Sequence, residues 1–191
     1  MNKVTIDQLI QGLREIPDAD FVSEFVYDFL SANPVELDSI RKYFYWSPDF
    51  YTRNLVHKNQ RFEVMAVCWE PGQVSRVHNH DGQQCWMTVP MGRLRGQNFA
   101  IEAIDRTTGY CKLRETDTFD LSDCLAARVE LDAPVHQMLN LKEHGERAVS
   151  IHIYSKPYDK CLSYCRDTDT FKEVQLYYTS IDGKLCDGVT L

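Results

Sequence analysis

The chain has 191 residues, 43% hydrophobic and 12% aromatic, which is a globular composition with enough length to bury a core. A formal charge of −7 argues against a nucleic-acid surface, because phosphate binding needs clustered lysine and arginine. No apolar run is long enough to span a membrane, and acidic residues interrupt the apolar pattern at the start, so we expect neither a membrane span nor a signal peptide. Seven cysteines without a C-x2-C pair then predict free thiols in the cytoplasm.

Residues 1–46 predict a helical segment, because apolar residues recur with helical spacing. The apolar faces consist of Ile6, Leu9, Ile10 and Leu13 in the first helix, and of Phe21, Phe25, Val26 and Leu30 in the second. We expect a third helix to begin at Asn33 as its N-cap, with Pro34 in the first helical position and Glu36 completing a capping box.

Residues 47–191 predict a β structure. Short segments rich in β-branched and aromatic residues occur at 61–69, 84–92, 147–155 and 174–180, separated by Gly, Asp and Asn. Many short strands without intervening helices favour an antiparallel sandwich or barrel over βαβ units. We therefore expect one domain, 1–191, that consists of a helical N-terminal part and a β-barrel.

The stretch "RVHNHDGQQC" contains two histidines with one residue between them. In a strand, His78 and His80 point to the same side, as two ligands of one metal must. The alternative is an exposed pair on a solvated strand, which the pattern alone does not exclude. Further along, "DAPVHQMLN" contains His136, a candidate third ligand, and Asn140.

At this point the sequence resembles the two-part signature of the cupin barrels. The matching residues are Gly72, His78, His80, Gly92, Pro134, His136 and Asn140. Where most cupins carry a glutamate ligand, this chain has Cys85. The segments 51–56, 68–72 and 150–161 also resemble the cysteine dioxygenase family, in its arginine-type branch with a cysteine–tyrosine pair.

The resemblance implies a mainly β fold, a cupin or small antiparallel jelly roll behind an N-terminal helical segment. It implies a monomeric cytoplasmic enzyme that converts L-cysteine and O2 to cysteine sulfinate, with Fe(II) on His78, His80 and His136. Three neutral imidazoles leave the ion its full 2+ charge and open positions, which suits a thiolate substrate. The implied partner is a small-molecule thiol, with no nucleic acid and no membrane.

The segment "AVSIHIYS" alternates between apolar residues and Ser150, His152 and Tyr154. From the pattern alone, this row could face solvent or a polar barrel interior. The resemblance implies the interior: Tyr154 beside the oxygen site, His152 orienting its hydroxyl and Ser150 fixing the His152 ring. It also implies a thioether cross-link between Cys85 and Tyr154, whereas Cys85 as a zinc ligand is the competing interpretation.

An isolated arginine such as Arg53 is usually a surface residue. The resemblance instead implies that Arg53 binds the substrate carboxylate, with Tyr51 assisting and Cys161 lining the pocket. In the family, Tyr154 would be followed by a turn with a cis bond before proline. Here Lys156 stands at that position, which leaves open whether the turn keeps the same backbone.

Two other functions remain open from the sequence. The first is a dioxygenase for another small thiol such as 3-mercaptopropionate, although relatives that prefer it tend to carry a glutamine nearby for the task that the resemblance gives to Arg53. The second is a non-oxidative zinc cupin that acts as a binding module.

Overall fold

The computed structural model describes residues 3–21, 23–129 and 135–191, so Pro134 of the cupin signature lies outside the described residues. The helical elements are α1 Ile6–Glu15, η1 Asp18–Asp20, α2 Ser23–Ala32, η2 Leu37–Tyr43 and η3 Lys142–His144, where η marks a 3-10 helix. The predicted helical N-terminal segment is thus confirmed. Within the described residues, no helix is long and apolar enough to cross a membrane.

Helix α1 begins with a capping box at Thr5. The Gln8 backbone N–H donates to Thr5 Oγ1, and the Thr5 backbone N–H donates to Gln8 Oε1. The helix buries the face that its periodicity predicts, formed by Ile6, Leu9, Ile10 and Leu13. The capping box sets where the helix begins, and the apolar face sets which side of the helix packs on the sheet.

The predicted start of the third helix is wrong. Asn33 is not an N-cap: its side-chain amide donates to the Phe29 carbonyl at 2.7 Å and so satisfies the end of α2. Val35 forms a parallel bridge with Val4, and the Glu36 N–H donates to the Val4 carbonyl at 2.8 Å. This pairing keeps residues 33–36 extended, so η2 begins only at Leu37.

The strands form two sheets. Their bounds are β1 Thr52–Lys58, β2 Glu63–Trp69, β3 Val77–His78, β4 Cys85–Met91, β5 Arg93–Asp105, β6 Tyr110–Ser122, β7 Ala126–Val129, β8 Val135–Leu139, β9 Ala148–Tyr154, β10 Lys160–Cys165, β11 Thr170–Gln175, β12 Ser180–Ile181 and β13 Lys184–Leu185. Among the described strands, one sheet has the order β13-β12-β1-β2-β9-β4-β7, and the other closes on itself as β10-β11-β6-β5-β8-β3. The mainly β fold is therefore confirmed.

The expected strand at 174–180 is only partly present, because β11 ends at Gln175. The Thr179 N–H then donates to the Arg53 carbonyl at 2.7 Å, so the chain crosses to the edge of the first sheet. The crossing segment, Leu176–Thr179, consequently runs past the side chains of β1.

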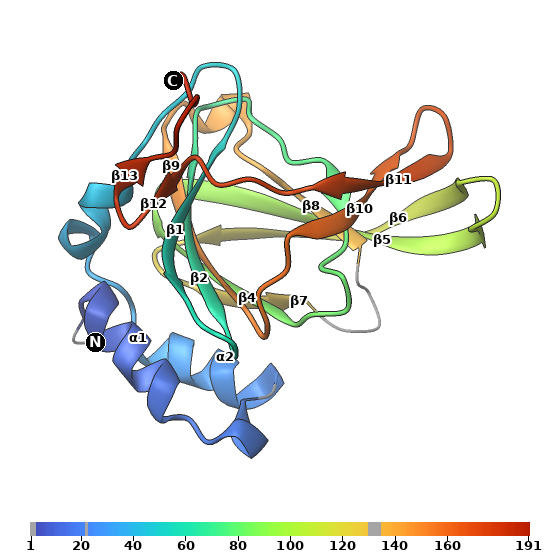
Figure 1. Ribbon diagram of the computed structural model, residues 1–191. Helices are drawn as coiled ribbons and strands as arrows, with labels where there is room; N and C mark the ends of the chain where they lie inside the picture. The colour runs from blue at the N-terminus through green and yellow to red at the C-terminus, as the bar shows by residue number, and fades with distance from the viewer. Residues whose placement is uncertain (1–2, 22, 130–134) are drawn as a thin grey trace.

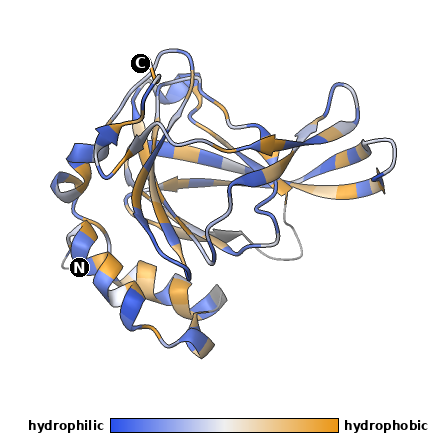
Figure 2. Ribbon diagram, viewed as in Figure 1, coloured by the Kyte–Doolittle hydropathy of each residue, from blue (hydrophilic) through white to orange (hydrophobic). Residues whose placement is uncertain are grey.

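The helices cover the outer face of the first sheet (Figure 1). Val64, Ala66 and Cys68 of β2, and Val149, Ile151 and Ile153 of β9, share one core with α1 and α2. Figure 2 shows hydrophobic and hydrophilic residues alternating around both helices, as expected when one face packs on a sheet. The alternate residues of β2, Met65, Val67 and Trp69, belong to a second core inside the barrel.

Gly92 of the signature forms the tight turn from β4 to β5. Its φ is +71°, a conformation that side chains rarely adopt, and an added Cβ would collide with the Arg147 carbonyl oxygen. The glycine is therefore required by the close approach of the chain before β9.

Candidate active site

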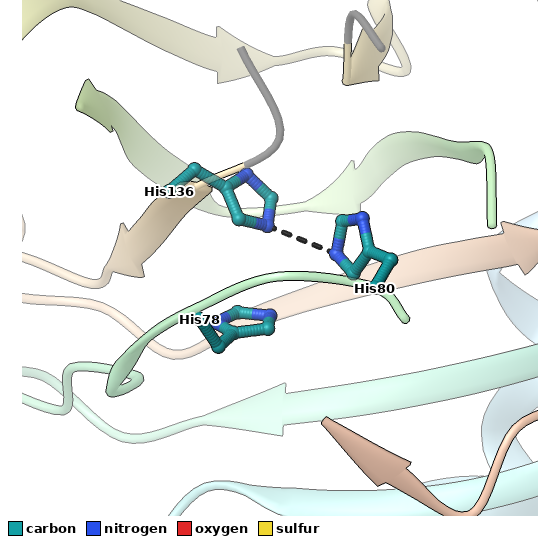
Figure 3. A group of neighbouring side chains, drawn as sticks. All are labelled: His78, His80 and His136. Atoms are coloured by element: carbon teal, nitrogen blue, oxygen red, sulfur yellow. Dashed lines mark hydrogen bonds between the residues drawn. The ribbon is translucent and has the colours of Figure 1, made fainter. Parts of the chain in front are cut away.

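Three histidines meet inside the barrel (Figure 3). His78 ends β3 and is the register partner of His136 on β8, while His80 lies in the loop after β3. One ring nitrogen of each lies within 4.8 Å of the others, and the Nε2 atoms of His80 and His136 are 3.1 Å apart. That separation suits two ligands of one divalent ion at about 2.1 Å from each. The structure thus brings together the three residues predicted as ligands.

The loop, rather than strand periodicity, turns His80 inward. The Asn79 N–H donates to the Leu162 carbonyl at 3.2 Å, and Asn79 Oδ1 accepts from the Leu162 N–H at 2.8 Å. The Gln83 N–H then donates to the His80 carbonyl at 2.9 Å, which closes a turn. Asn79 therefore fixes the loop to β10, while His80 remains 3% exposed.

The three rings are neutral. Burial lowers the pKa of His78 to about 4, with a smaller lowering by Arg53, and burial holds the pKa values of His80 and His136 well below their usual range. His78 Nδ1 lies 2.8 Å from the Arg76 carbonyl oxygen, so this nitrogen carries the proton and Nε2 has a free lone pair. In the described chain the group contains no carboxylate or thiol, so it fits a divalent transition metal bound by imidazole alone.

Cys85 lies outside the histidine group. It opens β4 directly opposite Tyr154 of β9, and the two side chains are 1% and 5% exposed. Burial raises the pKa of the Cys85 thiol, and a hydrogen bond with the Tyr154 hydroxyl opposes this. The register therefore places Cys85 beside Tyr154, as the predicted pair requires, and not among the ligands.

The polar row of β9 faces the barrel interior. Ser150 Oγ lies 2.8 Å from His152 Nε2, and the Tyr154 hydroxyl lies 3.4 Å from His152 Nδ1. The indole N–H of Trp69 donates to Ser150 Oγ at 3.0 Å. All four side chains are at most 6% exposed, so the solvent-facing alternative is excluded.

Trp69 constrains the hydrogen bonds in this row. An indole N–H only donates, so Ser150 Oγ accepts from it, and His152 Nε2 is the acceptor that the described residues offer to the Ser150 proton. The ring proton of His152 then sits on Nδ1 and is donated to the Tyr154 hydroxyl oxygen. Burial lowers the pKa of His152 to about 3, so the ring stays neutral. The sequence assigned no role to Trp69.

A cavity of about 50 Å³ joins these groups. It is lined by Tyr51, Arg53, Val67, Trp69, Ser75, His78, His136, Met138, His152, Tyr154, Tyr158 and Leu176. Tyr51 stacks on Trp69 with 4.5 Å between ring centroids, and both also face Arg53 across this space. A wider groove shares Tyr51 and Arg53 with the cavity, and its lining also includes Arg76, Lys172 and Glu173, so cations outnumber the carboxylate at the entrance.

Arg53 is a half-buried cation. Its Nε donates to the Met65 sulfur at 3.3 Å, and within the described residues no carboxylate lies within ion-pair distance of its guanidinium. Burial acts to lower the pKa of Arg53, but nearby Tyr154 and Tyr158 outweigh it and raise the value. The guanidinium is thus charged, inside the cavity wall and without an anionic partner.

Cys161 is buried on β10 in the same core as Tyr154, although it is not among the residues that line the cavity. Sequence reasoning missed Tyr158, which lines the cavity, and Glu63, which is 1% exposed and opposite Tyr154 in the strand register. Glu63 Oε2 accepts from the Tyr178 hydroxyl at 2.7 Å. Because β2 is buried on both faces, no periodicity marks Glu63 as a residue near the site.

The turn after Tyr154 differs from the backbone that the resemblance suggested. The described chain has no cis peptide bond, so the Ser155–Lys156 bond is trans. The Ser155 N–H donates to the Gln84 carbonyl at 3.0 Å, and the Gln84 N–H donates to Ser155 Oγ at 2.9 Å. This pair of bonds holds the end of β9 against the residue before Cys85.

The two other histidines of the chain, His57 and His144, are half-buried. Asn59 Nδ2 lies 3.2 Å from His57 Nε2, and the His144 ring lies 3.1 Å from the Arg93 carbonyl oxygen. Neither histidine lines the cavity. Asn140 has a structural part, because its amide donates to the carbonyls of Trp69 and Glu146.

A β-barrel that holds three convergent histidines around a small cavity defines a metal-binding enzyme of the cupin class. The family model for cysteine dioxygenase type I matches residues 1–167. Cysteine dioxygenase type 1 of Danio rerio is 26% identical over 191 residues, covering 96% of this chain and 90% of that protein. The Rattus norvegicus protein of the same name is 28% identical over 190 residues, covering 92% and 86%. The chain therefore belongs to the cysteine dioxygenase type I family and is an oxygenase-type enzyme.

Among solved structures, the chain is similar to an uncharacterized conserved protein with a double-stranded β-helix domain from Klebsiella pneumoniae. The two are 17% identical with a TM-score of 0.48, over 72% of this chain and 95% of that one.

Proposed function

We propose that this chain oxidises the thiol of L-cysteine with O2 to the sulfinic acid, using Fe(II) bound by His78, His80 and His136. The reaction balances as R–SH plus O2 giving R–SO2H. The O–O bond breaks, two S–O bonds form, and sulfur supplies the four electrons that O2 accepts, so no other reductant is needed. Membership of the cysteine dioxygenase type I family supports this activity.

The ion would be held by the three neutral imidazoles, and when bound it would bring thiolate and O2 together and activate the O2. The observation that carries the proposal is the charged Arg53 in the wall of the same cavity, without an anionic partner among the described residues. A planar guanidinium binds a carboxylate through two parallel hydrogen bonds. We infer that Arg53, with Tyr51, holds the carboxylate while the thiol faces the histidines.

The remaining residues would position protons. Tyr154 has its oxygen held by His152 and lines the cavity. We propose that the Cys85 sulfur and the Tyr154 ring become joined by a thioether: the S–H bond and one ring C–H bond break, a C–S bond forms, and O2 takes up the two electrons and two protons as hydrogen peroxide. Their direct opposition on neighbouring strands supports this. Cys161 would pack behind the residues that line the substrate side of the cavity.

Oxygen uptake by iron-loaded protein tests the function. We expect uptake with L-cysteine, a sulfinate product by mass spectrometry, and slower turnover of 3-mercaptopropionate, which lacks the amine. Zinc-loaded protein is the matched control and should consume no oxygen. Full zinc occupancy in the purified protein without oxygen uptake after iron loading would overturn the proposal, and faster turnover of 3-mercaptopropionate would change the substrate.

We further propose a monomeric cytoplasmic protein whose partner is the small thiol alone. The seven cysteines are all free, which fits a reducing compartment. Light scattering during size-exclusion chromatography tests the monomer, for which a mass near 22.2 kDa is expected.

A further inference from the structure

Tyr158 is a second tyrosine in the cavity wall. It lies in the loop between β9 and β10, is 9% exposed, and packs edge-on against Tyr154 with 5.0 Å between ring centroids. Its ring also lies 6.2 Å from that of His80. Both Tyr154 and Tyr158 line the cavity that contains Arg53. The function proposed above assigns no role to Tyr158.

The surroundings of Arg53 indicate what the Tyr158 hydroxyl does. Tyr51, Tyr154 and Tyr158 line the same cavity as Arg53, and burial raises the pKa of each phenol, so their hydroxyls keep their protons and can donate. A carboxylate offers about four lone-pair positions, and a bidentate guanidinium fills only two of them. An anion held by Arg53 therefore still needs donors, and the nearby hydroxyls supply them.

The Tyr158 hydroxyl forms a hydrogen bond with that of Tyr154, so a bound carboxylate would compete with Tyr154 for the Tyr158 proton. Tyr154 also receives the Nδ1 proton of His152, so it keeps a partner when Tyr158 turns to a ligand. The buried ring of Tyr158 is held by Tyr154, so its hydroxyl needs little ordering when a ligand arrives.

We propose that Tyr158 is a specificity-determining residue whose hydroxyl donates a hydrogen bond to the carboxylate of the thiol held by Arg53. The site then selects small thiols that carry a carboxylate over aminothiols that lack one. This inference rests on the proposed function, because it assumes a carboxylate-bearing thiol in the cavity. Loss of one hydrogen bond to a charged group corresponds to about a 10- to 100-fold loss of affinity.

The test uses Tyr158→Phe, which keeps the ring and removes the hydroxyl. Iron(II)-loaded protein is titrated anaerobically by calorimetry with 3-mercaptopropionate and with cysteamine, which has no carboxylate. We expect Tyr158→Phe to weaken 3-mercaptopropionate about 10- to 100-fold and to leave cysteamine unchanged. In turnover, KM for L-cysteine should rise more than kcat falls.

The matched control is Tyr164→Phe, a tyrosine that is 7% exposed on β10 and lies in another core cluster away from the cavity. It should change neither affinity. Equal weakening of both thiols by Tyr158→Phe, or no weakening of either, overturns the inference. The titrations need no turnover, so they test the inference separately from the proposed reaction. If Tyr158→Phe weakens only 3-mercaptopropionate but the wild type consumes no oxygen, the proposed reaction is refuted and the inference on Tyr158 is not.

Discussion

Ser150→Ala removes the link between Trp69 and His152. Ser150 Oγ accepts from the Trp69 indole at 3.0 Å and lies 2.8 Å from His152 Nε2, and the described structure gives neither atom a second partner. The substitution therefore leaves two buried polar groups unpaired. At about 1–3 kcal/mol for each, the free energy of unfolding should fall by about 2–6 kcal/mol. For a chain of this size, that is a decrease in Tm of about 5–20 °C.

Thermal unfolding of the metal-free protein measures this loss. Ser163→Ala is the matched control, because Ser163 is 6% exposed and its hydroxyl makes no hydrogen bond to another described residue. The iron-loaded variant should also lose about 10- to 100-fold in kcat, since His152 no longer has a fixed tautomer to orient Tyr154. A decrease in Tm no larger than that of Ser163→Ala would refute the stabilising role of these two hydrogen bonds.

Three further predictions concern charge, covalent chemistry and pH. Arg53→Gln should raise KM for L-cysteine about 10- to 100-fold. Tm should not fall, because this cation has no ion-pair partner in the described chain. A lowered Tm would reveal a structural ion pair. Prolonged turnover should reduce the intact mass of the wild type by two hydrogens but not that of Cys85→Ser, and an unchanged wild-type mass would contradict the link to Tyr154. His78 and His152 stay neutral in the folded state down to a pKa of about 4 and about 3, while the unfolded chain takes up these protons below about pH 6.5. Urea unfolding of metal-free protein should show stability present at pH 7 and lost as the pH falls toward 4, by about 1.4 kcal/mol per pH unit for each histidine, whereas a flat profile would mean exposed rings.

The residues whose chemistry depends on local spacing were predictable from the sequence. His78, His80 and His136 meet as expected, but strand periodicity explains only part of this. Only His78 lies in β3, and His80 turns inward because Asn79 fixes the following loop to β10. The alternation in β9 indicated two faces correctly, yet it did not show that the apolar face lies under helices and the polar face inside a barrel.

Residues that reach the site through strand pairing could not be predicted. Trp69 contacts Ser150 because β2 and β9 are neighbours, and no local pattern carries that register. In the sequence, Glu63 is a polar residue at the start of an expected strand. The pairing of β2 with β9 buries it opposite Tyr154. The error at Asn33 has the same origin, since a bridge between Val35 and a distant segment overrides a favourable local cap.

The charges in the described lining of the cavity favour an anionic ligand. Its described lining contains one cation, Arg53, three histidines without protonated rings, and no Asp or Glu. A divalent ion on neutral ligands would add two further positive charges in a poorly screened space, where each uncompensated charge is costly. A carboxylate at Arg53 and a thiolate near the histidines together supply two of the three negative charges needed. A thiol with a pKa of about 8.5 is mostly protonated at neutral pH, so this field favours its loss of a proton on binding. The chain carries a net charge of −7, yet Arg76 and Lys172 outnumber Glu173 at the entrance, so the anion would meet net positive charge before it reaches the cavity.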